Sequence, residues 1–118
     1  MTNVYRVENE CRFGPYTPDA ESIGLRVGET PEHPLAKNDG LTPVTPNEIF
    51  VFASLDLLVN WFAEDRDVLE DYGYRVVEIN IRSRTRLRHG NSKKQSVYKD
   101  DPKRPAPRRV LDFDEVFG

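Results

Sequence analysis

Four arginines at alternate positions in the second half of the chain are its clearest candidates for chemistry. In an extended segment, residues two apart point to the same face, so the four side chains would form one basic row. Guanidinium groups bind phosphate oxygens through paired hydrogen bonds, and such a row would match a nucleic-acid backbone or the diphosphate of a nucleotide. The four residues are Arg82, Arg84, Arg86 and Arg88.

The same row also has a purely structural interpretation. A solvated edge strand can carry charges because they prevent it from pairing with the edge of another molecule. Single-stranded nucleic acid is bound partly by stacking on aromatic residues, and Tyr98 is the only one near the row. Phosphate binding and edge protection therefore stand as two hypotheses, with nucleic acid as one candidate partner.

Metal chemistry and nucleophilic catalysis find little support in the residue pattern. His33 and His89 lie far apart and outside any metal-binding spacing, and Ser54 has no Gly-x-Ser-x-Gly elbow around it. A group of acids near residue 65 does not match the spacing of a calcium loop and is typical of a solvated helix surface. We therefore expect no metal site. The acidic group comprises Glu64, Asp65, Asp67, Glu70 and Asp71.

Residues 48–82 hold the only dense supply of apolar side chains that could form a core. Residues 49–52 are an uninterrupted apolar run, which predicts a short buried strand. The hydroxyl of Ser54 can then accept a hydrogen bond from a free N–H group in the first turn of a helix. Apolar residues recur after it with the period of a helix, which predicts one broad buried face. They are Leu55, Leu58, Val59 and Phe62, with Leu57 and Trp61 widening the face.

Two further strands and a turn are predicted after this helix. Residues 74–82 alternate between apolar and polar, as expected of a half-exposed strand. Residues 89–91 read His-Gly-Asn and predict a turn after the arginine row, from which residues 95–98 would return as a hairpin partner. The result would be a basic β-hairpin.

The first half of the chain is predicted to hold one strand and a long loop. Residues 4–7 are β-prone and bounded by polar residues, with Arg6 on the opposite face from its two neighbours. Residues 19–47 contain glycines and prolines too closely spaced for a long helix or strand. A loop of this length within a compact domain is usually functional or mobile, so we consider it a candidate lid.

Length and composition describe one small domain. The chain has 118 residues, 37% of them hydrophobic and 31% charged, which suits a single domain with a modest core. Cys11 is the only cysteine, which excludes an internal disulfide framework and agrees with a reducing cytoplasm. The sequence lacks a signal peptide at its N-terminus and an apolar run approaching the ~20 residues that cross a bilayer. We therefore expect a cytoplasmic protein with no membrane partner.

The net charge of −3 conceals a strong segregation of charge along the chain. Residues 1–74 carry five Lys/Arg and fourteen Asp/Glu, whereas residues 75–109 carry twelve and three. Residues 110–118 carry no base and three acids. This asymmetry predicts either a surface that binds polyanions or a basic segment that pairs with an acidic one.

The end of the chain is expected to lie outside the main α+β domain, which we place at residues 1–98. Residues 99–109 contain three prolines and no large apolar residue, so we interpret them as an extended tether rather than part of the core. Residues 110–118 are amphipathic and could dock on their own domain, on a second copy in a homodimer or on a partner. The docking side chains would be Leu111, Phe113 and Phe117.

The order of these elements resembles a compact ADP-ribosyltransferase-like domain. The resemblance is carried by a first strand with an arginine (VYRV), a loop-rich excursion, a strand followed by a serine and a helix (FVFASLDLLVNWF) and a closing strand (GYRVVEINI). In that family an Arg or His on the first strand and a Ser or Tyr after the second hold NAD, and a Glu beginning a later strand directs transfer. By this resemblance Arg6 and Ser54 match the first two positions, and Gln95 takes the third, where it departs from the glutamate.

That resemblance implies a nucleotide cleft with NAD or a related nucleotide as ligand, and no other cofactor. FASLDLLVNWF followed by GYRVV also resembles small proteins of bacteriophages and prophages. This second resemblance implies a role at the phage–host interface, with a host protein as partner and inhibition of a host defence enzyme as one form of it.

From the sequence we expect a single α+β domain with a mixed or antiparallel sheet, one main helix and a basic β-hairpin. Its expected function is that of a phage-type ligand- or partner-binding protein. Three alternatives stay open: an active NAD-dependent ADP-ribosyltransferase, a nucleic-acid-binding protein that uses the arginine row, and a protein inhibitor that acts through its acidic half or its C-terminal segment.

Overall fold

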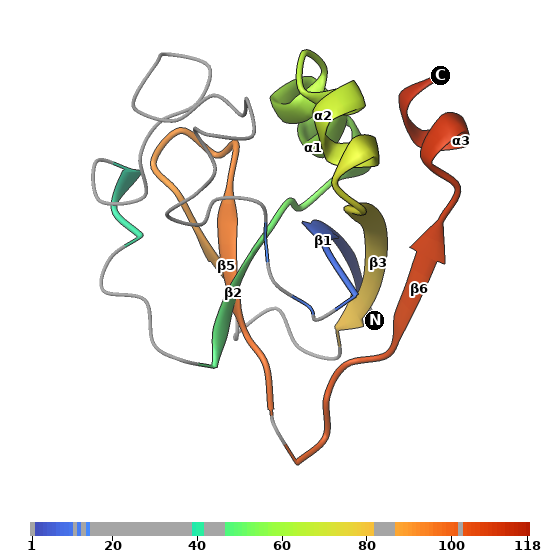
Figure 1. The fold of residues 1–118 in the computed structure, drawn as a ribbon. Coiled ribbons are helices and arrows are strands. Elements are labelled where there is room, and N and C mark those ends of the chain that lie inside the picture. Colours follow the sequence, from blue (N-terminus) through green and yellow to red (C-terminus); the bar gives the residue numbers. More distant parts are fainter. Residues whose placement is uncertain are drawn as a thin grey trace.

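The computed structural model describes residues 2–10, 12, 14, 39–41, 47–81, 87–101 and 103–118. Within them, two three-stranded antiparallel sheets stand beside each other and three helices gather at one end (Figure 1). This arrangement confirms the predicted α+β class and selects the antiparallel alternative. In chain order the elements are β1 (Thr2–Glu8), β2 (Glu48–Val51), α1 (Leu55–Phe62), α2 (Arg66–Asp71), β3 (Arg75–Ile81), β4 (Leu87–His89), β5 (Ser96–Lys99), β6 (Arg108–Leu111) and α3 (Phe113–Phe117).

The first sheet has the order β1-β3-β6, and the second has the order β2-β5-β4. The two sheets meet at one point, where Tyr5 and Phe52 exchange backbone hydrogen bonds. The Tyr5 nitrogen lies 2.9 Å from the Phe52 oxygen, and the Phe52 nitrogen lies 2.7 Å from the Tyr5 oxygen. Phe52 immediately follows β2, so the bridge joins the middle of β1 to the residue after the end of β2.

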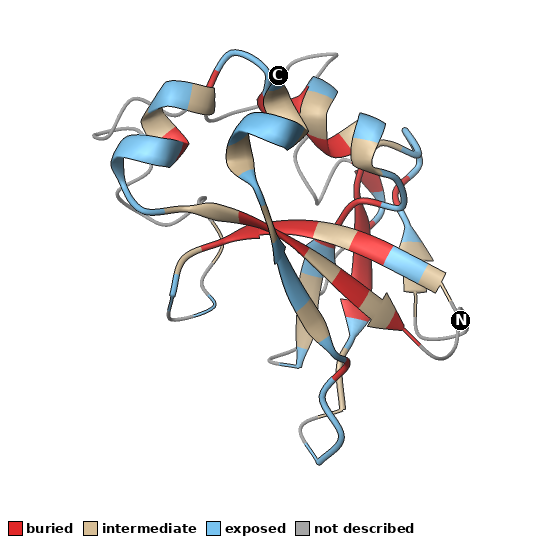
Figure 2. Cartoon of the chain, turned by 90° about the vertical axis from the view of Figure 1, so that its right-hand side faces the viewer, coloured by how far each residue is buried: buried red, intermediate tan, exposed pale blue. Residues whose placement is uncertain are grey.

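The core has two parts because both faces of the first sheet are covered. On one face, Val7 and Val76 pack with the buried side of α1. On the other, Val4 and Ile79 pack with residues of the second sheet. Figure 2 shows the buried residues concentrated along the crossing strands and on the inner sides of the helices. The prediction that one face of β3 is exposed is wrong at Val76. This residue is buried because the helices cover that end of the strand.

The predicted helix forms with the predicted cap. Ser54 Oγ accepts a hydrogen bond from the Leu57 nitrogen at 3.3 Å, and α1 buries Leu58, Trp61 and Phe62. The solvated helix surface expected of the acidic group is present in the short helix α2, where Asp67, Glu70 and Asp71 are exposed, but Asp65 is buried. This helix forms within the acidic run, where it buries Leu69 against the same core.

The basic hairpin is confirmed for its described part. β4 and β5 are antiparallel neighbours, with Arg88 opposite Val97 and His89 opposite Ser96. Residues 82–86 lie outside the described residues, as does most of the long loop at 19–47 that we considered a candidate lid. Among the described residues, none of the helices has the length and apolar character needed to cross a membrane.

The interpretation of residues 99–109 as a tether outside the core is wrong for its second half. Ala106 is buried between the sheets, and Arg108 begins β6, which pairs with β3. The Pro107 carbonyl also accepts a hydrogen bond from the Asn80 nitrogen at 3.0 Å. Strand pairing supplies the contacts that the missing apolar side chains could not, so this stretch belongs to the sheet.

Candidate functional site

Three residues singled out from the sequence lie around the bridge between the two sheets. Arg6 follows Tyr5 on β1, and Ser54 stands two residues beyond Phe52. Gln95 immediately precedes Ser96, the β5 residue opposite Val51. The junction brings the three predicted positions to one region of the fold, where each makes contacts with other residues. We call Tyr5, Arg6, Phe52, Ser54 and Gln95 the strand junction.

Arg6 of β1 reaches across to the backbone of β2. Its side chain is 9% exposed. Nη1 donates to the Phe50 carbonyl at 2.9 Å and Nη2 donates to the Arg12 carbonyl at 3.3 Å, while Nε lies 3.3 Å from Glu8 Oε1. Gly14 also approaches closely, since a Cβ on it would come within 3.4 Å of Nη2. Arg6 therefore ties β2 and the segment after β1 to the first sheet.

A chain of buried charges extends from Arg6. Glu8, which is 1% exposed, receives Arg108 Nε at 3.4 Å on the same Oε1 that faces Arg6. Arg108 Nη1 in turn lies 3.6 Å from Asp100 Oδ2. We call Arg6, Glu8, Asp100 and Arg108 the Glu8 cluster. Two cations and two carboxylates alternate in it, so each buried charge has an opposite neighbour.

Burial is the main influence on the pKa of Arg6 and lowers it from its usual value. The attraction of Glu8 opposes this shift, and the repulsion from Arg108 adds to it. Arginine starts from such a high pKa that its guanidinium stays charged at neutral pH. The strand junction thus contains a permanent, largely desolvated cation.

Ser54 differs from Arg6 in being exposed at the surface. Its hydroxyl caps α1 through the contact with the Leu57 nitrogen. A hydroxyl has one donor and two acceptor positions, so capping leaves the donor for another group. The predicted roles of Ser54 as helix cap and as ligand contact are therefore compatible, and the structure shows the first.

Gln95 is buried at the end of the β4–β5 turn, and its Nε2 donates to Asp39 Oδ2 at 3.2 Å. Asp39 also binds Ser92, whose nitrogen lies 2.6 Å from Oδ1 and whose Oγ lies 2.9 Å from Oδ2. The turn passes so close that a Cβ on Gly90 would overlap Asp39 Oδ2. We call Asp39, Gly90, Ser92 and Gln95 the Asp39 cluster.

Of the arginine row, the described part of the chain includes Arg88; Arg82, Arg84 and Arg86 lie outside it. Arg88 belongs to β4, at the edge of the second sheet. It donates to Glu48 Oε2 through Nε at 3.1 Å, and to the Leu41 carbonyl through Nη2 at 3.1 Å. Arg88 thus binds acceptors within its own chain.

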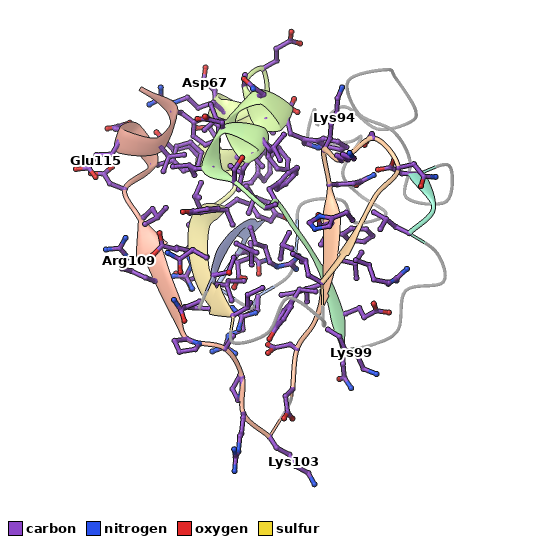
Figure 3. All side chains as sticks on the ribbon, turned by 180° about the vertical axis from the view of Figure 1, so that it is seen from behind. Asp67, Lys94, Lys99, Lys103, Arg109 and Glu115 are labelled. Atoms are coloured by element: carbon purple, nitrogen blue, oxygen red, sulfur yellow. The ribbon has the colours of Figure 1, made fainter. Side chains whose placement is uncertain are left out.

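Several ion pairs join the basic segment to acids elsewhere in the chain. Arg88 pairs with Glu48, and Arg108 pairs with Glu8 from the acidic first half. Other charges remain at the surface: Asp67 and Glu115 point outward at the helical end, and Lys103 lies at the opposite tip (Figure 3). Of the two consequences expected from charge segregation, internal pairing is therefore visible in the described residues.

The C-terminal segment docks on its own domain, the first of the three predicted possibilities. Leu111, Phe113 and Phe117 are partly buried and pack against the core next to α1, and the rings of Phe113 and Phe117 lie 4.8 Å apart. Arg66 of α2 fastens α3 by donating to Asp114 Oδ1 at 2.6 Å and to the Gly118 carbonyl.

Sequence reasoning missed Glu8, Asp39 and Arg108, which organise the two clusters. Glu8 could have been noticed as an acid on the same strand face as Arg6, two residues away. Asp39 and Arg108 carry no comparable signal, because they reach their partners across 53 and 100 residues of sequence. Among the described residues, no three His, Cys, Asp or Glu side chains gather closely enough to hold a metal ion.

The fold and the junction describe a small two-sheet α+β protein whose sheets are joined at a charged, largely buried seam. The model of one protein family, described as Bacteriophage T4 Y00F protein, matches residues 1–109. The chain therefore belongs to the Bacteriophage T4 Y00F protein family, which confirms the predicted likeness to small phage proteins. Curated proteins and solved structures give no significant match to it.

Proposed function

We propose that this phage protein binds a nucleotide of the NAD class at the strand junction, without transferring its ADP-ribose, and that it acts on a host process. The observation that supports the proposal is the position of Arg6 within β1, next to the Tyr5–Phe52 bridge. Ser54 stands two residues after Phe52, and Gln95 precedes the β5 residue that pairs with Val51. These are the positions at which the ADP-ribosyltransferase-like resemblance places its ligand contacts. They are far apart in the sequence, at residues 6, 54 and 95.

Arg6 supports binding of an anionic ligand through its charge and its fixed position. A guanidinium has five N–H donors, and the hydrogen bonds to Phe50 and Arg12 engage two of them, while Nε faces Glu8 as an ion pair. A cation held by main-chain acceptors is already oriented before a ligand arrives, so less entropy is lost on binding. In this proposal Arg6 attracts the diphosphate and Ser54 donates its hydroxyl proton to a ligand oxygen.

Gln95 supports binding rather than transfer. Transfer of ADP-ribose passes through a centre with oxocarbenium character, which a nearby carboxylate stabilises by its charge. A neutral amide has no such charge, and the Gln95 amide is already engaged with Asp39. In this proposal the protein binds the nucleotide in the host cell. It then either presents the nucleotide to a host protein or withholds it from host enzymes.

The host process is proposed from family membership and from the ligand together. A phage protein that sequesters a nucleotide, or that presents it to a host protein, would alter host enzymes that depend on that nucleotide. Countering a host defence enzyme is the form of this function that we propose, with the host protein as its partner.

Isothermal titration with NAD, ADP-ribose and ATP tests the proposal. The matched variant is Ser54→Gly, because glycine replaces a serine cap at a cost of only a few tenths of a kcal/mol while removing the hydroxyl. We expect binding of at least NAD or ADP-ribose, weakened by about tenfold in Ser54→Gly through loss of one hydrogen bond. If none of the three nucleotides binds at ~1 mM, the junction is not a nucleotide site.

Incubation with labelled NAD and a host lysate separates binding from transfer. We expect no labelled protein product even at high concentrations of the phage protein. Labelled product that depends on Arg6 would instead establish an active transferase and overturn the binding-only part of the proposal.

A further inference from the structure

Within the described part of the chain, the Asp39 cluster joins a buried carboxylate to uncharged donors. Asp39 is 2% exposed, and its side chain accepts hydrogen bonds from the Ser92 nitrogen, the Ser92 hydroxyl and the Gln95 amide. Its main-chain carbonyl accepts a further one from the Asn91 nitrogen at 2.8 Å. Asp39 therefore fastens residues 39–41 to the β4–β5 turn and touches the third predicted ligand position directly.

The chemistry of this contact determines what residue 95 can be. An ionised carboxylate has acceptors and no donor, so Gln95 must turn its amide nitrogen toward Asp39. A glutamate at residue 95 would instead place a second negative charge at hydrogen-bond distance from the first. Two carboxylates that share a site repel each other unless one takes up a proton.

We propose that Asp39 is a positioning residue of the strand junction, which fixes the orientation of Gln95 and selects an amide over a carboxylate there. This inference rests on the proposed function. It explains why the nucleotide would be bound without transfer of ADP-ribose, because the contact that orients Gln95 also excludes a carboxylate at residue 95. Asp39 itself acts through Gln95.

The tight packing around Asp39 supports a positioning role. A Cβ at Gly90 would overlap Oδ2 and lie 2.6 Å from Cγ, and the Gly90 nitrogen donates to the Gln95 carbonyl at 2.9 Å. The carboxylate is thus enclosed by the turn on one side and by its donors on the other. A side chain held in this way cannot rotate to accept a changed partner without moving the turn.

An exchange of the two functional groups tests the assignment. The variants are Asp39→Asn, Gln95→Glu and the double variant, compared by urea unfolding. Gln95→Glu should lower the folding equilibrium constant by about tenfold, because it sets two carboxylates against each other. Asp39→Asn should cost less, because the Gln95 amide can turn its oxygen toward the new amide nitrogen, which removes the orientation that Asp39 imposes. The double variant should recover most of the loss caused by Gln95→Glu. The amide introduced at residue 39 can donate to the carboxylate introduced at residue 95 while its oxygen still accepts from the Ser92 nitrogen, and the Ser92 hydroxyl can turn to become an acceptor.

Additive losses in the double variant would overturn the assignment, since they would show that the two side chains do not act as a pair. Failure of the double variant to fold would overturn it in the same way. Asp56→Asn, which changes an exposed acid in the first turn of α1, is the matched control. It should lower the folding equilibrium constant only about two- to fivefold, or about 0.3–1 kcal/mol, which is the contribution of such a charge to the helix dipole, and should show no coupling to Gln95→Glu.

A second measurement distinguishes positioning of a ligand contact from support of the turn alone. ADP-ribose is titrated into the folded wild type, Asp39→Asn and Asp56→Asn proteins. Positioning predicts affinity about tenfold weaker in Asp39→Asn and unchanged in Asp56→Asn. Equal affinity in all three would overturn the positioning role. If ADP-ribose does not bind the wild type, NAD is titrated in its place. Absence of binding of ADP-ribose, NAD and ATP would refute the proposed function, while the exchange experiment would still decide whether Asp39 selects the amide.

Discussion

Glu8 and Asp39, two of the buried carboxylates in the described part of the chain, are satisfied in opposite ways. Glu8 lies between two arginines, so the Glu8 cluster balances charge with charge. Asp39 lies among a hydroxyl, an amide and a main-chain N–H, so the Asp39 cluster balances charge with neutral dipoles. This difference determines how each cluster responds to a substitution. Removing one charge from the first cluster leaves an uncompensated ion, whereas the second can be rearranged by exchanging donors and acceptors.

The largest predicted effect comes from neutralising Glu8. Glu8→Gln leaves Arg6 and Arg108 facing each other without their shared carboxylate, and we expect a loss of about 3–5 kcal/mol in the free energy of unfolding. Urea denaturation measures it. Glu10→Gln removes the same charge at an exposed position and should cost little. A loss below ~1 kcal/mol in Glu8→Gln would show that the buried pairing is energetically unimportant.

Adding one methyl group at Gly90 should break the Asp39 cluster by crowding. The new Cβ of Gly90→Ala would overlap Asp39 Oδ2, and we expect a cost of about 1–3 kcal/mol. The same change in an Asp39→Ala background should cost much less, because the overlapping atom is gone. A double-mutant cycle in urea measures this coupling, and equal costs in the two backgrounds would contradict the crowding.

Arg66 offers a surface ion pair for comparison with the buried ones. It holds α3 through Asp114 and the Gly118 carbonyl, but the Asp114 side chain is 79% exposed. We therefore expect Arg66→Ala to cost only about 0–1 kcal/mol, because water screens the pair. Amide hydrogen exchange should become faster in α3 and stay unchanged in β3. Equal acceleration in both would mean that α3 supports the whole first sheet.

The smallest predicted effect concerns Tyr5 at alkaline pH. Burial, followed by the charge of Glu78 and a hydrogen bond to it, raises the pKa of Tyr5 above its usual 10.0. Because the raised pKa favours the neutral phenol in the folded state, the stabilisation is present below pH 10 and is lost as the pH rises through the folded-state value. Unfolding midpoints of Tyr5→Phe should therefore fall less steeply above about pH 10 than those of the wild type. Parallel curves would contradict the shift.

Residues 48–82 show how far the sequence alone predicts this fold. The apolar run, the serine cap, the helical spacing and the alternation in β3 depend on neighbours within about one or two turns, so the sequence carries each signal directly. The basic hairpin was predictable for the same reason, from a turn flanked by two β-prone segments. The sequence does not predict β6, because its four residues, two of them arginine, do not alternate between apolar and polar. Pairing with β3 makes this segment a strand.

The candidate site stays a prediction. Arg6, Ser54 and Gln95 were named from a resemblance in element order, and the bridge between Tyr5 and Phe52 explains why these three residues lie in one region. Their surroundings were not predictable, because no local pattern reports that Glu8 meets Arg108 or that Asp39 meets Gln95.

The sequence by itself determined the α+β class, the capped helix, the antiparallel hairpin and the segregation of charge, since these follow from local spacing and composition. Tertiary structure alone decided how the charges are used. It placed Arg108 beside Glu8 and Arg88 beside Glu48, so that part of the basic segment neutralises the acidic first half. The physical reason is that an electrostatic interaction depends on distance in space, and the chain brings these groups together only when both sheets have formed.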